Sequence, residues 1–153
     1  MMKIRILCVG KIKEPYLRKG IAHYEGLIRK KAQIEIIEVP DEKTPEKASE
    51  KEELLIKRTE GEKLLKHIPD DAVVYALCID GKQLTTKQLR NQLKTAQDAG
   101  KQSFVFVIGG SLGLDDQVIK KANKKISFSA MTFPHQMMRM ILLEQINRCI
   151  NEE

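Results

Sequence analysis

The strand-like run Ser103–Ile108 is apolar at five consecutive positions, 104–108, and is followed by Gly109. This pattern limits the folds open to the chain. Successive side chains of a strand point to opposite faces, so such a run needs a sheet that is covered on both sides. Residues 72–79 form a second run of this kind, and Lys3–Val9 reads as a third buried strand. Sheets buried on both faces are typical of parallel α/β proteins.

Helical patterns alternate with these strands, and several helix starts are marked. Ser49 with Glu52 and Thr85 with Gln88 have capping-box spacing. The sequence therefore predicts an α/β fold, a mainly parallel sheet flanked by helices, as a single domain over residues 1–153. The predicted strands are 3–9, 34–39, 72–79, 103–108 and 126–128, and the predicted helices are 15–30, 49–67, 85–99, 115–123 and 134–150.

Three loops follow predicted strands and should meet at one edge of the sheet. They cover residues 77–82, 109–114 and 128–135, and we expect Asp80-Gly81 to end the strand before the first loop. In open parallel sheets, ligands bind beyond the carboxyl ends of the strands. The sequence therefore predicts a small-molecule site at this edge.

The second loop contains three closely spaced glycines, Gly109, Gly110 and Gly113. Their spacing is not the GxGxxG of dinucleotide-binding proteins, and no Gly-Lys-Ser/Thr follows as in a P-loop. Such a turn allows close backbone approach and leaves N–H groups free to donate. A purely structural turn explains the same residues, so the pattern leaves both interpretations open.

The third loop alternates short polar and apolar side chains. Ser127, Ser129 and Thr132 could hydrogen-bond an adenine edge or a ribose, and Met131 and Phe133 could form apolar walls. A capped entry into the last helix explains these residues as well.

His135 lies in the first turn of the last predicted helix, where the helix dipole disfavours a charged imidazole. It is the candidate neutral base or hydrogen-bond donor, and the alternative is a partly exposed packing residue. His23 and His67 lie in charged helices and look inert. No sequence pattern indicates a metal site.

Charge and cysteine content narrow the possible partners and compartment. The chain has 27 basic and 21 acidic residues, a net charge of +6, with the basic excess toward its two ends. This distribution indicates either a polyanion-binding face or solvated helix surfaces. Cys8, Cys78 and Cys149 are an odd number without CxxC spacing, which fits a reducing, cytoplasmic setting. No apolar run approaches the ~18 residues of a membrane span.

Apolar residues in the last predicted helix are too many for one narrow stripe. They are Met137, Met138, Ile141, Leu142, Leu143, Ile146, Cys149 and Ile150. A helix covered on more than one side is either at a subunit interface or deeply buried within one chain.

The segments VFVIGGSLGL (105–114) and ISFSAMTFPHQMMRMILLEQINR (126–148) closely resemble the bacterial ribosomal RNA large subunit methyltransferase H (RlmH) family of the SPOUT superfamily. Residues 3–17, the EVPDEKTPEKAS loop and CIDGKQLT also resemble it. The resemblance implies a trefoil knot in the carboxyl-terminal segment, a homodimer and an S-adenosylmethionine cofactor. The implied activity is methylation of N3 of a pseudouridine in helix 69 of 23S rRNA, on the assembled 70S ribosome.

The same resemblance implies positions for the site. Basic side chains would contact RNA phosphates, and we expect Lys11, Lys13 and Arg139 in that role. The implied cofactor-binding residues are Leu77, Gly109, Phe128, Ser129, Ala130, Met131, Thr132 and Phe133.

Two features of the sequence depart from the family pattern. Position 130 is Ala where Lys is common, and members usually continue past the last helix into an Arg-Gly-Glu-Pro-Tyr-His-Lys-like tail, where this sequence reads CINEE. An alternative expectation is therefore a homologue that binds the cofactor but is catalytically impaired. A third interpretation, an unrelated nucleotide-binding α/β module, would bind a nucleotide more tightly than S-adenosylhomocysteine.

Overall fold

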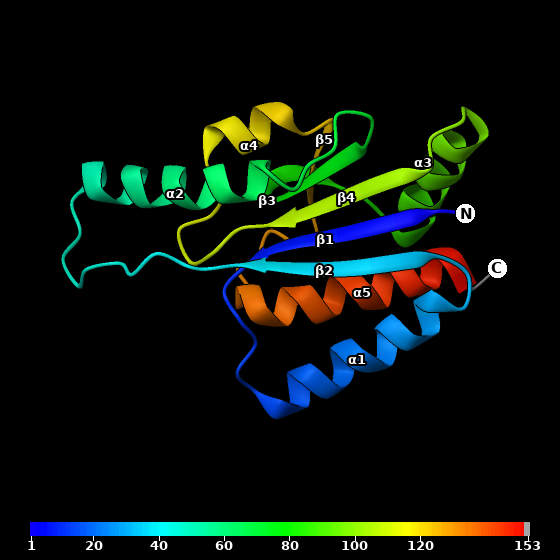
Figure 1. The fold of residues 1–153 in the computed structure, drawn as a ribbon, viewed down its shortest axis with the longest axis horizontal. Helices are drawn as coiled ribbons and strands as arrows, with labels where there is room; N and C mark the ends of the chain where they lie inside the picture. Colours follow the sequence, from blue (N-terminus) through cyan, green and yellow to red (C-terminus); the bar gives the residue numbers. More distant parts are fainter. Residues whose placement is uncertain (152–153) are drawn as a thin grey trace.

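The computed structural model describes residues 1–151, which fold around a five-stranded sheet (Figure 1). The strands lie in the order β2-β1-β4-β3-β5, and every pair of neighbours is parallel. The predicted α/β class with a mainly parallel sheet is confirmed. The strands are β1 (Lys3–Val9), β2 (Gln33–Val39), β3 (Val73–Gln83), β4 (Ser103–Ile108) and β5 (Lys124–Ser127).

The helices of the described residues 1–151 lie on the two faces of the sheet, α1 and α5 on one side and α2 and α4 on the other, with α3 beside α5 (Figure 1). Both predicted capping boxes form, at Ser49 before α2 and at Thr85 before α3. No helix within residues 1–151 is both long and apolar enough to cross a membrane. The helices are α1 (Pro15–Arg29), α2 (Glu50–Leu65), α3 (Thr86–Asp98), α4 (Asp116–Lys121) and α5 (His135–Asn151).

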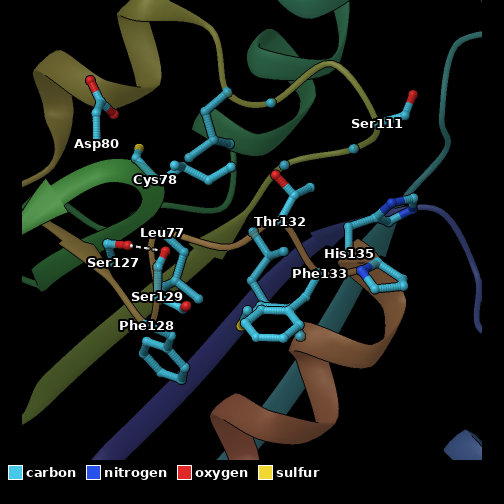
Figure 2. A pocket seen from close by; sticks show the side chains of 18 of the residues that line it. Leu77, Cys78, Asp80, Ser111, Ser127, Phe128, Ser129, Thr132, Phe133 and His135 are labelled. Atoms are coloured by element: carbon cyan, nitrogen blue, oxygen red, sulfur yellow. Dashed lines mark hydrogen bonds between the residues drawn. The ribbon is translucent and has the colours of Figure 1, made fainter. Parts of the chain in front are cut away.

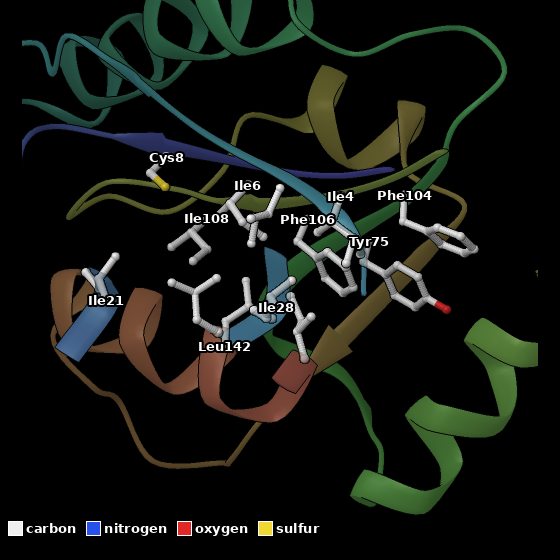
Figure 3. Close-up of a cluster of buried hydrophobic side chains, with 14 of the residues drawn as sticks. Ile4, Ile6, Cys8, Ile21, Ile28, Tyr75, Phe104, Phe106, Ile108 and Leu142 are labelled. Atoms are coloured by element: carbon white, nitrogen blue, oxygen red, sulfur yellow. The ribbon is translucent and has the colours of Figure 1, made fainter. Parts of the chain in front are cut away.

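The core divides into two layers because strand side chains alternate between the faces. Ile6 and Phe106 point to the layer under α1 and α5, and the ring of Tyr75 stacks on Phe106 at a centroid distance of 4.9 Å (Figure 3). Leu7 and Val107 point to the layer under α2 and α4. All five side chains are fully buried, as the consecutive apolar runs predict.

The third strand does not end at Asp80-Gly81, and this prediction was wrong. Leu77 and Lys82 both pair with Ile126 of β5, so the residues between them form an irregularity in a strand that continues further. A Cβ atom on Gly81 would lie 2.6 Å from the carbonyl carbon of Ile126. Glycine therefore lets the chain turn against β5 and resume pairing.

The helices and the strand predicted after β4 all form, and only their first and last residues differ from the prediction. β5 spans Lys124–Ser127 instead of 126–128, with Lys124 and Lys125 paired to β3 at the edge of the sheet. Lysine on an edge strand discourages pairing with another chain. The trefoil knot concerns the path of this segment and stays a prediction.

Candidate functional site

A pocket of about 470 Å³ lies at the carboxyl edge of the sheet, where the three loops meet (Figure 2). Pockets of this size accommodate drug-sized ligands and cofactors. The walls come from the ends of β3, β4 and β5 and from the first turn of α5. The lining residues are Leu77, Cys78, Ile79, Asp80, Ile108, Gly109, Gly110, Ser111, Leu112, Gly113, Leu114, Ile119, Ile126, Ser127, Phe128, Ser129, Met131, Thr132, Phe133, Pro134, His135 and Met138.

The glycine turn after β4 closes tightly on itself. The N–H of Gly113 donates to the carbonyl of Gly110 at 3.0 Å, and Gly113 has a φ of +88°. A Cβ atom on Gly109 would lie 2.6 Å from the carbonyl carbon of Gly113. Position 109 therefore requires glycine, and its backbone forms the pocket wall without an intervening side chain.

The loop after β5 is held by its own serines. The hydroxyl of buried Ser127 donates to the carbonyl of Ser129 at 2.8 Å (Figure 2). The Ser129 hydroxyl in turn accepts from the N–H of Met131 at 3.0 Å. These bonds fix the loop backbone and leave the side chains of Thr132 and Phe133 at the pocket. The Met131 side chain is 72% exposed and could close over a ligand.

His135 begins α5 and lines the pocket with its half-buried side chain. Burial lowers the pKa of His135, the nearby Arg139 guanidinium lowers it further, and Asp41 opposes the shift. The imidazole is therefore neutral at pH 7. A neutral imidazole can accept a proton from a bound group.

The structure brings most of the predicted cofactor residues together at the pocket, and their role in cofactor binding stays a prediction. Ala130 is exposed and does not line the pocket. Sequence reasoning missed Ile119 and Met138, which reach the pocket because α4 and α5 pack beside it, and no local pattern marks them. The predicted residues that line the pocket are Leu77, Gly109, Phe128, Ser129, Met131, Thr132 and Phe133.

The basic residues predicted to contact RNA fall in two different environments. Lys11 and Lys13 are exposed in the loop that leaves β1 at the same edge of the sheet. The Arg139 side chain is only 1% exposed, and it pairs with Glu38 at 2.6 Å. A guanidinium buried in this way does not fit a contact with phosphate on the surface, and we correct that expectation.

Metal-binding side chains are not clustered in the described part of the chain. Residues 1–151 contain no group of three or more His, Cys, Asp or Glu side chains that could hold an ion. Burial raises the pKa of the Cys8 thiol to about 12, with Arg139 opposing the shift and Glu38 adding to it. The Cys8 thiol is therefore protonated and packs as a small apolar group.

Comparison with known proteins identifies the family. A family profile described as "Predicted SPOUT methyltransferase" matches residues 2–151. The chain is 53% identical to a protein of Bifidobacterium animalis subsp. lactis, 50% to one of Bacillus cytotoxicus and 48% to one of Enterococcus faecalis. Each match covers 96% of this chain and 92% of the relative, and each relative is named ribosomal RNA large subunit methyltransferase H. The chain therefore belongs to the SPOUT methyltransferase family, among relatives of the RlmH group.

Proposed function

We propose that this protein is an S-adenosylmethionine-dependent methyltransferase of 23S rRNA. One observation carries the proposal: three strand-end loops form one pocket in a chain about half identical to enzymes named for rRNA methylation. The proposed target is N3 of a pseudouridine in helix 69 on the assembled ribosome, in the cytoplasm.

The chemistry of the pocket lining supports this choice of cofactor. Apolar side chains such as Leu77 and Ile126 offer walls for an adenine ring, and Thr132 offers a hydroxyl for ribose. The glycine turn would present bare backbone to a bound cofactor, because any Cβ atom on Gly109 would collide with the turn itself. When bound, the cofactor supplies an activated methyl group, so the residues must exclude water and align the acceptor.

His135 is the proposed proton acceptor for the methylated nitrogen. The imidazole of His135 lies at the pocket. Burial lowers its pKa most, Arg139 lowers it less strongly, and Asp41 raises it. A neutral imidazole at pH 7 can take the N3 proton as the new bond forms.

RNA binding is proposed for the exposed side chains of Lys11 and Lys13, which lie on a loop at the same edge as the pocket. Each phosphate contact by a cation releases counterions, so ribosome binding should weaken as salt rises. The net charge of +6 favours the same encounter.

Calorimetric titration with S-adenosylmethionine, followed by methyl transfer from labelled cofactor to 70S ribosomes lacking the modification, tests the proposal. We expect binding and transfer, with the label at one pseudouridine. Binding without transfer would indicate the cofactor-binding but catalytically impaired homologue. Absence of binding by the folded protein would overturn the enzyme assignment.

A further inference from the structure

The buried polar side chains of residues 1–151 gather at one edge of the sheet. They are Glu60, Ser127 and Arg139, with exposed fractions of 5%, 4% and 1%. Ser127 holds the pocket loop, and Glu60 lies beneath the glycine turn, 3.3 Å from where a Cβ atom on Gly110 would be. Arg139 is the largest fully buried side chain; its only part in the proposed reaction is to lower the pKa of His135, and RNA binding does not use it.

The Arg139 guanidinium joins three segments that are distant in the sequence. Nη1 donates to Oε2 of Glu38 on β2 at 2.6 Å, across 101 residues. Nη2 donates to the carbonyl of Gly10 at 3.1 Å and more weakly to that of Val9 at 3.5 Å, at the end of β1. We call this set of contacts the Arg139 clamp. It fixes α5 to the carboxyl ends of two neighbouring strands.

The clamp acts on the part of α5 that borders the pocket. Arg139 lies one turn after His135, so the two side chains project from the same helix face. The helix begins immediately after the loop of residues 128–134, and the carbonyl of Pro134 accepts the first helical bond, from Met138. Holding Arg139 therefore sets where this loop ends and where the imidazole points.

Stability alone is a poor explanation for a buried charge at this position. Removing a guanidinium from water is costly, and well-packed apolar residues often replace buried ion pairs without loss of stability. The ends of β1 and β2 are already joined, because the N–H of Gly10 donates to the carbonyl of Val39 at 2.8 Å. What the clamp adds is a connection between these strand ends and α5.

We propose that Arg139 is a positioning residue, which with Glu38 holds the first turn of α5 and the 128–134 loop in the geometry that the pocket needs. The inference rests on the proposed function, since this loop forms part of the proposed cofactor site. The planar fork of arginine reaches a carboxylate and strand carbonyls at once, whereas a lysine offers a single point of charge.

Three substitutions test the clamp: Arg139→Lys, Arg139→Met and Glu38→Gln. The matched control is Arg5→Met, because Arg5 also joins β1 to β2, pairing with Glu35 at 3.5 Å and donating to the His67 carbonyl. This second pair lies away from the pocket lining. The readouts are calorimetric affinity for S-adenosylhomocysteine, backbone amide shifts of residues 128–133, and the titration of His135 followed by NMR.

We expect Arg139→Lys to weaken S-adenosylhomocysteine binding about tenfold, and Arg5→Met to stay within about twofold of the wild type. Glu38→Gln should weaken binding in the same direction, and it remains informative if Arg139→Met fails to fold. Arg139→Met should raise the pKa of His135, while Arg139→Lys, which keeps the charge, should leave it nearly unchanged.

The NMR amide shifts of residues 128–133 test the inference whether or not the cofactor binds. Unchanged amide shifts at 128–133 in folded Arg139→Lys and Glu38→Gln, together with wild-type affinity, would show a merely structural pair and overturn the inference. A wild-type protein that binds no cofactor would overturn the proposed function instead, while shifted loop resonances in the variants would still support the clamp.

Discussion

Glu60 is a buried carboxylate that supports the backbone at Glu42 through a hydrogen bond, at a cost in the free energy of folding. It lies on α2, is 5% exposed, and accepts a hydrogen bond from the N–H of Glu42 at 3.0 Å. Burial raises the pKa of Glu60 above its usual value, and the Asp41 and Glu42 carboxylates add to the increase. The hydrogen bond from the Glu42 N–H is the strongest opposing effect, and Lys63 also lowers the pKa. The folded protein therefore binds a proton here more readily than the unfolded chain.

Glu60→Gln should increase stability at neutral pH, because the amide keeps an acceptor for Glu42 without a buried charge. A group with a raised folded pKa contributes stability below the unfolded pKa, and that contribution is lost as pH rises through the folded pKa. The free energy of unfolding of the variant should therefore exceed that of the wild type by about 1 kcal/mol at pH 7, and the difference should shrink toward pH 4.5.

Thermal and urea unfolding between pH 4.5 and 7.5 would measure this difference. Glu62→Gln, on the exposed side of the same helix, controls for the loss of one negative charge. The prediction would be contradicted if the stability gained by Glu60→Gln over the wild type were smaller at pH 7 than at pH 4.5.

Among the elements, the glycine turn after β4 combines a structural requirement with a role in the pocket. A Cβ atom on Gly109 would lie within 3.0 Å of three backbone atoms of Gly113 and Leu114. Backbone cannot move aside as a flexible side chain can. The turn must open to accept a larger residue, and the pocket wall moves with it.

Gly109→Ala should therefore reduce cofactor affinity more than about tenfold and destabilise the fold by about 1–3 kcal/mol. Gly26→Ala is the matched control, because a Cβ atom there meets nothing within 4 Å and the position is inside α1. That control should keep affinity and gain up to about 1 kcal/mol from helix propensity. Equal affinities in the two variants would show that the turn is structural only.

At the scale of the whole molecule, α3 and α5 border an open, partly apolar cleft in the described residues 1–151. This cleft has a volume of about 500 Å³ and is lined in part by Leu89, Phe133 and Ile141. Phe133 is 36% exposed and lines both this cleft and the candidate cofactor pocket. A second copy of the chain covering this face would also complete one wall near the site, in line with the homodimer that the family resemblance implies.

We expect light scattering to give twice the chain mass at micromolar concentration, and Ile141→Asp to shift the protein toward the monomer. A buried carboxylate at a subunit interface is costly, whereas on a free surface it is tolerated. Circular dichroism must show that the variant keeps its fold. A monomeric wild type would contradict the expected homodimer, and a dimer that Ile141→Asp leaves intact would place the interface elsewhere.

Much of this molecule follows from local sequence patterns. The consecutive apolar run of β4 is buried on both faces, and the boxes at Ser49 and Thr85 begin α2 and α3 as predicted. The meeting of three loops at one edge also follows, because parallel strands place their carboxyl ends together. These features depend on alternation and on hydrogen bonds between near neighbours, which the sequence displays directly.

Tertiary structure alone decided the features that depend on distant partners. β3 continues past Asp80-Gly81 because Ile126 of β5 offers pairing to both Leu77 and Lys82. Arg139, which was expected to contact RNA phosphate, is buried because Glu38 and the end of β1 lie opposite it. Pairing energies and burial are set by residues far away in the chain, so no local pattern contains them.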